Sequence, residues 1–354
     1  MRGSERLCRP ACAGEAEPCR PQAASARRIV AARRARAALV VAALVLAALP
    51  AAGDPAVPFG VRNLNPLTAI FGLPAWRAIG ARTELAVTTE VANHYRFSRR
   101  GAETLILDGE TWRTNLALSH VVGGRFRIGI EVPYYRQSGG RLDDLIDAWH
   151  SAFGLPDGGR NARPEDAIEY RLANAGGPFF TLDRPRGGAG DAQLSLAWRV
   201  GERRPYTVQA AVEVPTGDEA LLAGSGGTDW SLTVFRANEA TARARPGAWY
   251  WGVGAVRLEQ PELIDFDART AALVGILGGG WQIGRRFGLK AQLDFHGPLY
   301  DSRLEEIGKT AIQATFGGWV GLGRRGALEL AVIEDVAVST APDVVLHAAL
   351  RWTW

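Results

Sequence analysis

The chain has 354 residues, 47% of them hydrophobic and 22% charged, with a net charge of +4. This length allows one large β domain or two smaller ones. Much of the positive charge lies in the first 40 residues, so it gives no reason to expect a nucleic-acid partner.

A leader precedes the folded part of the chain. Residues 37–49 are an uninterrupted apolar run that follows a cluster of arginines and leads into small residues. This order is typical of a secretory signal peptide, which we place at 27–53 within a leader of 1–53. A retained membrane anchor is the alternative, but the run is short for a membrane span.

The cysteines all lie in that leader, at Cys8, Cys12 and Cys19. Their spacing matches no zinc or redox pattern, and we expect neither disulfides nor thiol chemistry in the exported chain. An exported chain without disulfides needs another source of stability. A closed barrel supplies one through a complete ladder of backbone hydrogen bonds.

Residues 54–81 contain several prolines, which argue against a regular element there. We predict a short N-terminal segment that lies inside or under a barrel and could act as a plug. The barrel itself is predicted to span 82–354.

From residue 83 onward, apolar and polar residues alternate, as they do along β-strands that have one apolar and one polar face. The glycine-rich strand at 269–283 has an ambiguous phase. The predicted strands are 83–97, 110–121, 125–136, 190–200, 205–215, 228–236, 247–258, 269–283, 287–296, 309–322, 326–335 and 343–354.

Short basic turns alternate with longer connections, of which 137–189 is the longest. Short turns on one rim and long loops on the other are typical of outer-membrane barrels, in which the short turns are periplasmic. We therefore predict an all-β fold, a transmembrane antiparallel up-and-down β-barrel of about 12 strands, over a soluble β-sandwich. Within the long loop, 141–153 has the apolar spacing of a short helix.

The last strand ends in outward-facing aromatic residues. Aromatic side chains sit at the membrane–water boundary, and this ending is similar to the assembly signal of outer-membrane barrels. We predict Leu350, Trp352 and Trp354 to be that signal, read by the barrel assembly machinery.

Several blocks of sequence carry a family resemblance. They are Asn65-Pro66, Phe71-Gly72-Leu73-Pro74, residues 103–113, residues 138–160, Pro215-Thr216-Gly217-Asp218 and residues 224–229. With them, residues 63–354 resemble an uncharacterised family of Gram-negative bacterial proteins, the domain of unknown function numbered 3187. The resemblance implies an outer-membrane β-barrel-like protein and transfers no functional residue.

Three groups of residues could carry chemistry, and for each of them we prefer a structural interpretation without a chemical function. Ser119 and His120 are adjacent on a strand and must face opposite sides, so they cannot form a catalytic dyad. The acidic residues and His150 of 143–150 form a solvated helix face more readily than a cation site. Gly224–Gly227 lacks the context of a phosphate loop and is predicted to be a flexible outer loop. We expect no catalytic residue, cofactor or metal, and no enzyme.

Charged residues on the polar face of the strands are the candidates for lining a lumen. They are Arg113, Arg127, Glu131, Asp191, Arg199, Glu213, Asp229, Lys290, Asp294, Glu329 and Arg351. They could line a water-filled pore and set its selectivity, or pair across the barrel and close it.

We therefore predict a protein of the outer membrane, exported by its signal peptide and surrounded by outer-membrane lipid. Its predicted function is that of a channel or binder for a small solute. The alternatives are a structural or adhesive protein with a closed lumen and, ranked last, a lipid-modifying barrel enzyme. Neither the solute nor the oligomeric state follows from the sequence.

Overall fold

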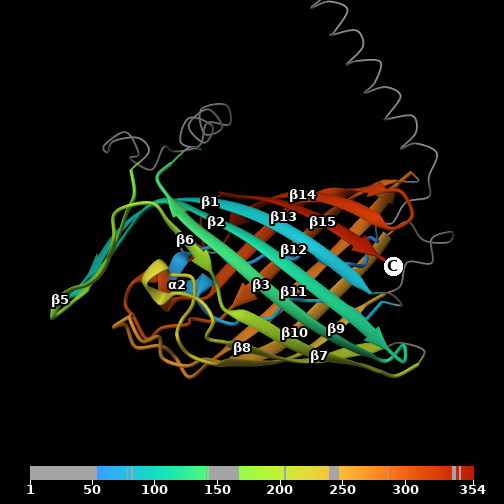
Figure 1. Cartoon of the computed structure of the whole chain (residues 1–354), viewed down its shortest axis with the longest axis horizontal. Helices are drawn as coiled ribbons and strands as arrows, with labels where there is room; N and C mark the ends of the chain where they lie inside the picture. Colours follow the sequence, from blue (N-terminus) through green and yellow to red (C-terminus); the bar gives the residue numbers. More distant parts are fainter. Residues whose placement is uncertain are drawn as a thin grey trace, which may run out of the picture. The chain divides into compact units, whose positions relative to one another are not determined.

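A computed structural model describes residues 54–354 except 78, 81–82, 141, 143–166, 203–204, 239–246, 285, 337–339 and 343. Its main feature is a closed 12-strand antiparallel barrel (Figure 1). The barrel strands are β1 (Glu84–Arg100), β2 (Glu103–Val122), β3 (Phe126–Ser138), β7 (Ala192–Val200), β8 (Tyr206–Val214), β9 (Asp229–Ala237), β10 (Gly247–Arg257), β11 (Ala271–Ile283), β12 (Phe287–His296), β13 (Ala311–Leu322), β14 (Gly326–Asp335) and β15 (Val344–Thr353).

The barrel closes where the first strand meets the last. β1 pairs with β15 in a continuous register from Glu84 opposite Thr353 to Ala92 opposite Val345. Every other barrel strand pairs with its neighbours in chain order, so the sheet has no free edge around the wall. The predicted fold class and strand number are confirmed, and each barrel strand overlaps its predicted range.

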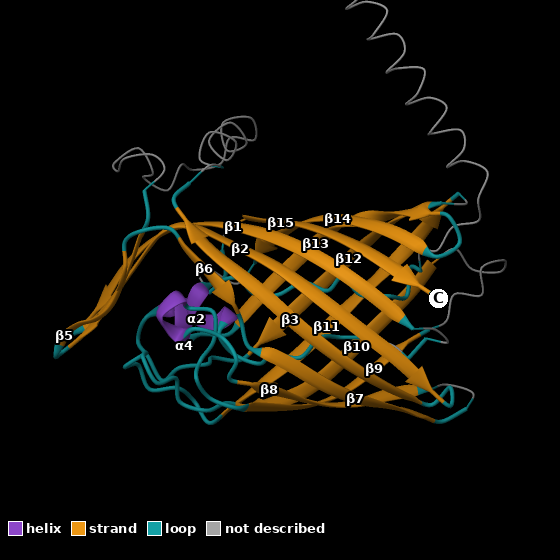
Figure 2. Cartoon of the chain, in the orientation of Figure 1, coloured by secondary structure: helices purple, strands orange, loops and turns teal. Residues whose placement is uncertain are grey.

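The connections define two rims. The turn rim carries the short connections at 123–125, 201–205, 284–286 and 323–325, and the chain also ends there. The loop rim, at the opposite end, carries the connections at 215–228, 258–270 and 297–310. Three short helices lie in the described part of the chain: α2 (Pro66–Ala69), η2 (Glu219–Leu221) and α4 (Glu305–Gly308), of which α2 and α4 are shown in Figure 2.

The first hairpin differs from the prediction. A long connection was expected after the first strand, but β1 and β2 both continue past the barrel to a turn at 101–102. Two further strands, β4 (Glu169–Asn174) and β5 (Gly177–Leu182), pair alongside β2 and extend the sheet beyond the loop rim (Figure 1). A third, β6 (Arg186–Ala189), pairs with the end of β3. The predicted helix at 141–153 lies outside the described residues apart from Leu142.

The outward face of the wall is apolar. Large hydrophobic side chains on it are well exposed, for example Leu232 at 59% and Leu289 at 57%. Trp198, Trp281 and Trp352 lie on the same face near the turn rim, as expected for an aromatic girdle. No helix among the residues described is long and apolar enough to cross a membrane.

The ambiguous phase of the glycine-rich strand is resolved in β11. Leu273, Leu277 and Trp281 are exposed on the outward face, whereas Val274 and Ile276 are buried inside. Both faces of this strand are therefore apolar, so the alternation of apolar and polar residues could not show which side chains face outward.

Candidate functional site

Residues 54–80 lie inside the barrel, where they run up one wall and down another. The first limb, 54–64, follows β12 from the turn rim towards the loop rim. The Lys290 ammonium donates a hydrogen bond to the carbonyl of Val57 (3.0 Å), and the backbone N–H of Phe59 donates to Gln292 Oε1 (2.9 Å). The wall thus holds the main chain of this limb with polar side chains.

The segment turns at the loop rim, where α2 forms. Asn63 Nδ2 lies 2.9 Å from His296 Nε2, and the Tyr300 hydroxyl donates to the carbonyl of Leu67 at 2.9 Å. An apolar cluster surrounds this turn and joins it to β2, β4 and the outer loops. Its members include Leu67, Ile70, Phe71, Leu105, Leu107, Tyr170, Leu172, Phe266, Tyr300, Leu304 and Ile307.

The second limb, 71–80, descends along β9, β8, β7 and β3 to the start of β1. Its main chain is again held by wall side chains. The contacts are Gly72 N–H to Asp229 Oδ2 (2.8 Å), Gln193 Nε2 to Leu73 O (3.2 Å), Gln209 Nε2 to Ala75 O (3.0 Å) and Arg127 to Arg77 O (3.2 Å).

Ion pairs lie on the side of the lumen opposite the second limb, where β12, β14, β15 and β1 form the wall. The Lys290 ammonium lies 2.5 Å from the Glu329 carboxylate, with side-chain exposures of 0% and 5%. Arg351 lies 3.0 Å from Glu84 and 3.5 Å from Glu329. These charges are paired with one another and removed from water, unlike charges that line a water-filled pore.

A second charged group joins β1, β2 and β15. Arg113 lies 3.0 Å from Glu90, and His347 Nδ1 lies 3.1 Å from the other Glu90 oxygen. All three side chains are buried. The Phe59 ring of the first limb packs edge-on against the His347 ring, so the inserted segment contacts this group as well.

The lumen candidates from the sequence all lie on the inward phase of the wall. Arg113, Arg127, Asp191, Glu213, Asp229, Lys290 and Glu329 are buried, and Glu131, Arg199, Asp294 and Arg351 are partly buried. Whether they line a solute pathway remains a prediction.

Arg62 and Arg77 were missed because their segment has no periodicity that assigns a side-chain direction. Glu84 and Glu90 of β1 lie on the inward-facing phase of their strand, as His347 and Arg351 do on β15. That phase could have identified Glu84, Glu90 and His347 as lumen residues from the sequence.

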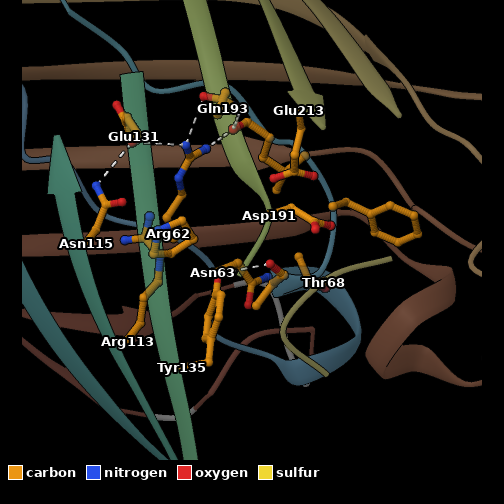
Figure 3. Close-up of a pocket in the computed structure, with 14 residues that line it drawn as sticks. Arg62, Asn63, Thr68, Arg113, Asn115, Glu131, Tyr135, Asp191, Gln193 and Glu213 are labelled. Atoms are coloured by element: carbon orange, nitrogen blue, oxygen red, sulfur yellow. Dashed lines mark hydrogen bonds and ion pairs between the residues drawn. The ribbon is translucent and has the colours of Figure 1, made fainter. Parts of the chain in front are cut away.

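Arg62 connects the two limbs to the wall (Figure 3). Its guanidinium donates to the carbonyl of Leu73, lies 3.3 Å from Gln193 Oε1 and pairs with Glu131 at 3.7 Å. Burial lowers the pKa of Arg62, and the Glu131 carboxylate opposes that shift. A cavity of ≈ 20 Å³ lies beside this arginine, lined also by Arg113, Asn115, Tyr135, Asp191 and Glu213 among others.

Asp191 organises the loop rim next to that cavity. Its carboxylate accepts hydrogen bonds from the backbone N–H groups of Thr216 (2.8 Å), Gly217 (2.6 Å) and Ser225 (3.0 Å). Burial raises the pKa of Asp191, and these backbone donors oppose the shift. The Gly224–Gly227 stretch, expected to be a flexible loop, is mostly buried and wraps this carboxylate.

The groups of residues considered for catalysis or metal binding form no such site among the described residues. Gly129 and Ile128 oppose Ser119 and His120 in the β2–β3 register, and the adjacent pair faces opposite sides of the wall. The described residues contain no group of three or more His, Cys, Asp or Glu placed to hold a metal ion. The acidic residues and His150 of 143–150 lie outside the described residues.

Comparison with solved structures supports the fold. The COG4313 outer membrane channel from Pseudomonas putida F1 is similar at a TM-score of 0.52 and 13% identity, covering 78% of this chain and 97% of that one. The NanC porin gives a TM-score of 0.42 at 7% identity, with 77% and 98% covered, which is too low to argue from. At such identities the likeness shows the fold alone.

Comparison of sequences gives the family. No curated protein matches the chain. The family described as "Protein of unknown function (DUF3187)" matches residues 37–354, which confirms the resemblance seen in the sequence blocks. The chain belongs to this DUF3187 family.

Proposed function

We propose that this protein is an outer-membrane channel or binder for a small solute, and that residues 54–80 close its passage in the conformation described. The periplasm would face the turn rim, and outer-membrane lipid would contact the apolar outer face. Leu350, Trp352 and Trp354 would be recognised by the barrel assembly machinery.

The observation that carries the proposal is how the inserted segment is held. Wall side chains such as Gln193, Gln209 and Lys290 bond to its main chain, and no described residue of 54–80 joins the strand ladder. A wall strand cannot leave without breaking the barrel. A segment held by side-chain bonds, each worth about 1 kcal/mol net, can move while the wall stays closed.

The size of the barrel supports a passage under the segment. An eight-stranded barrel is filled by its own side chains, whereas 12 strands enclose more space. Here that space is occupied by the inserted segment. The solved structure similar at TM-score 0.52 is an outer membrane channel, which agrees with this proposal without carrying it.

A structural or adhesive protein with a permanently closed lumen is the second candidate. The burial of the Lys290–Glu329 pair favours it, since a permanently filled interior needs paired charges. The sheet extension formed by β1, β2, β4 and β5 beyond the loop rim would then be the functional part. A lipid-modifying enzyme ranks last, because Ser119 and His120 face opposite sides of the wall.

Single-channel recording in planar bilayers tests the choice. The mature protein is compared with a variant in which residues 55–79 are replaced by a Gly/Ser linker of equal length. We expect rare or small current steps for the unchanged protein and steady, larger steps for the variant. A tight bilayer with both proteins, each inserted and heat-modifiable, would contradict the channel and favour the structural role.

A further inference from the structure

One part of the inner wall carries an excess of acids. Near the loop rim, Glu131 on β3, Glu213 on β8, Asp229 on β9 and Asp191 before β7 face the lumen, and all are largely or fully buried. Glu213 and Asp229 are direct cross-strand partners. Like charges placed opposite each other destabilise a sheet unless a cation lies nearby.

Two cations of the inserted segment meet this wall, because Arg77 also pairs with Glu131, at 3.4 Å. Arg62 pairs with Glu131 at 3.7 Å and contacts the Gln193 amide oxygen at 3.3 Å. The wall's own Arg113 also lines the cavity, and its guanidinium pairs with Glu90 at 3.0 Å. Figure 3 shows the Arg62 side chain between Glu131 on one side and Glu213 on the other.

The cavity beside Arg62 offers more acceptors than Arg62 uses. Glu213 Oε2 and Asn115 Oδ1 both belong to residues that line it, at 8% and 3% exposure. Neither oxygen has a hydrogen-bond partner within the described part of the chain, and Arg113 Nε is the one unpartnered donor among the same lining residues. Buried oxygens without a donor are costly, so this arrangement favours a ligand that brings several N–H groups.

We propose that the cavity lined by Asn115, Glu131, Gln193 and Glu213 is a binding site for a small organic cation, one with a guanidinium or primary ammonium group. Arg62 occupies the site as an internal ligand while the inserted segment is in place. This inference rests on the proposed function, since it names the class of solute that competes with the segment.

The chemistry of the lining selects this class. A guanidinium presents five N–H donors in a planar fork that matches carboxylate and amide oxygens, as Arg62 itself does here. A neutral isostere would leave the carboxylates without a counter-charge. The described residues hold no group of three or more His, Cys, Asp or Glu placed for a metal ion.

Binding to the Arg62→Ala variant of the mature chain tests the site. Methylguanidinium chloride is the probe, and N-methylurea is its neutral counterpart of similar shape. By calorimetry in detergent we expect the cation to bind Arg62→Ala at least about tenfold more tightly than the urea, and more tightly than it binds the unchanged protein. Adding Glu213→Gln should remove most of that preference, whereas adding Glu202→Gln, at an exposed turn, should not.

Two results would overturn the inference. One is equal affinity of Arg62→Ala for methylguanidinium and N-methylurea; the other is a preference that survives Glu213→Gln. If Arg62→Ala does not fold alone, its refolding yield with each compound replaces the calorimetry: rescue by the cation only supports the site, and no rescue or equal rescue counts against it.

Conductance separates this inference from the proposed function. A conducting linker variant that methylguanidinium does not block, together with no cation preference in Arg62→Ala, removes the site and leaves the channel. Cation-selective binding to a protein whose variants never conduct leaves the site and removes the channel.

Discussion

Gly72 lies close against the wall. A Cβ atom placed there would lie 2.8 Å from the Cβ of Glu213 and 2.9 Å from that of Asp229. The Gly72 N–H also donates to Asp229. The absence of a side chain at this position therefore allows the second limb to reach its hydrogen-bond partner.

Gly72→Ala should loosen the second limb. The added methyl must move the segment or the wall, at a cost of about 1–3 kcal/mol to the closed arrangement. We expect channel openings in planar bilayers to become roughly tenfold more frequent, since 1.4 kcal/mol is a factor of ten. Gly60→Ala is the matched control, because a Cβ at Gly60 meets nothing within 4 Å. Equal opening frequencies in both variants would show that this contact does not hold the segment.

The buried Lys290–Glu329 pair can also be tested by a single substitution. Removing one partner leaves the other charge buried and uncompensated, which costs about 3–5 kcal/mol. Glu329→Gln should therefore lower the free energy of unfolding in denaturant by roughly 3 kcal/mol or more. Glu202→Gln, at an exposed turn, should change it by less than about 0.5 kcal/mol. If the two variants were equally stable, the pair would not be buried as described.

Strand β2 pairs with β1 along its length but changes its neighbour on the other side. It pairs with β3 from Glu110 to Val122 and with β4 from Thr104 to Asp108. Gly109 lies between the two ladders with a φ of 141°, a backbone conformation that side chains disfavour. This one residue allows the wall strand to leave the barrel and carry the outer extension.

Gly109→Ala should weaken the extension more than the barrel. The new Cβ would lie 2.8 Å from the carbonyl oxygen of Ser138, and strain of this kind costs about 1–3 kcal/mol. We expect faster proteolysis at 169–182, measured by mass spectrometry, in a barrel that remains heat-modifiable. Gly177→Ala shares a positive φ but meets nothing within 4 Å, so it controls for backbone strain alone. Unchanged proteolysis in Gly109→Ala would contradict the partner change.

Sequence periodicity was sufficient to find the wall strands and the phase of most of them, with β11 as an exception, and it was insufficient for the extension. Along most of the wall, lipid on one side and a polar lumen on the other impose a period of two. In the extension, both faces of β2 carry residues such as Leu105, Ile106 and Leu107, because one face packs on the apolar cluster at the loop rim. Alternation ends there, and the strand was mistaken for a loop.

At the scale of the whole molecule, the barrel depends on the contact between its first and last strands. Trp352 opposes Leu85 of β1 and Gly326 of β14, so the end of β15 is bonded on both sides. The prolines of 54–81 predicted a segment inside or under the barrel, but no local pattern in the sequence could assign the wall residues that hold it. Its main-chain contacts come from wall residues up to 293 positions away, as between Arg351 and Pro58.

Deleting Trp352–Trp354 should prevent assembly. The deletion removes the register pairs at the turn rim and the outward aromatic residues together. We expect the heat-modifiable, membrane-inserted fraction to fall below about a tenth of the total, since closure needs both ladders. Thr353→Ala, which keeps the strand and both tryptophans, should assemble normally. Normal assembly of the truncated chain would show that the last residues are not an assembly signal.

Residues 54–80 fill the barrel, and the accessibility of single thiols to a reagent in water measures whether they do. Residues 54–354 contain no cysteine, so single cysteines report cleanly. Thr68→Cys places one in α2, at 2% exposure, and Glu202→Cys places one at an exposed turn. In the folded, heat-modifiable barrel we expect a membrane-impermeant maleimide to label Thr68→Cys at least about a hundredfold more slowly than Glu202→Cys. Equal labelling rates would mean that the segment lies outside the lumen.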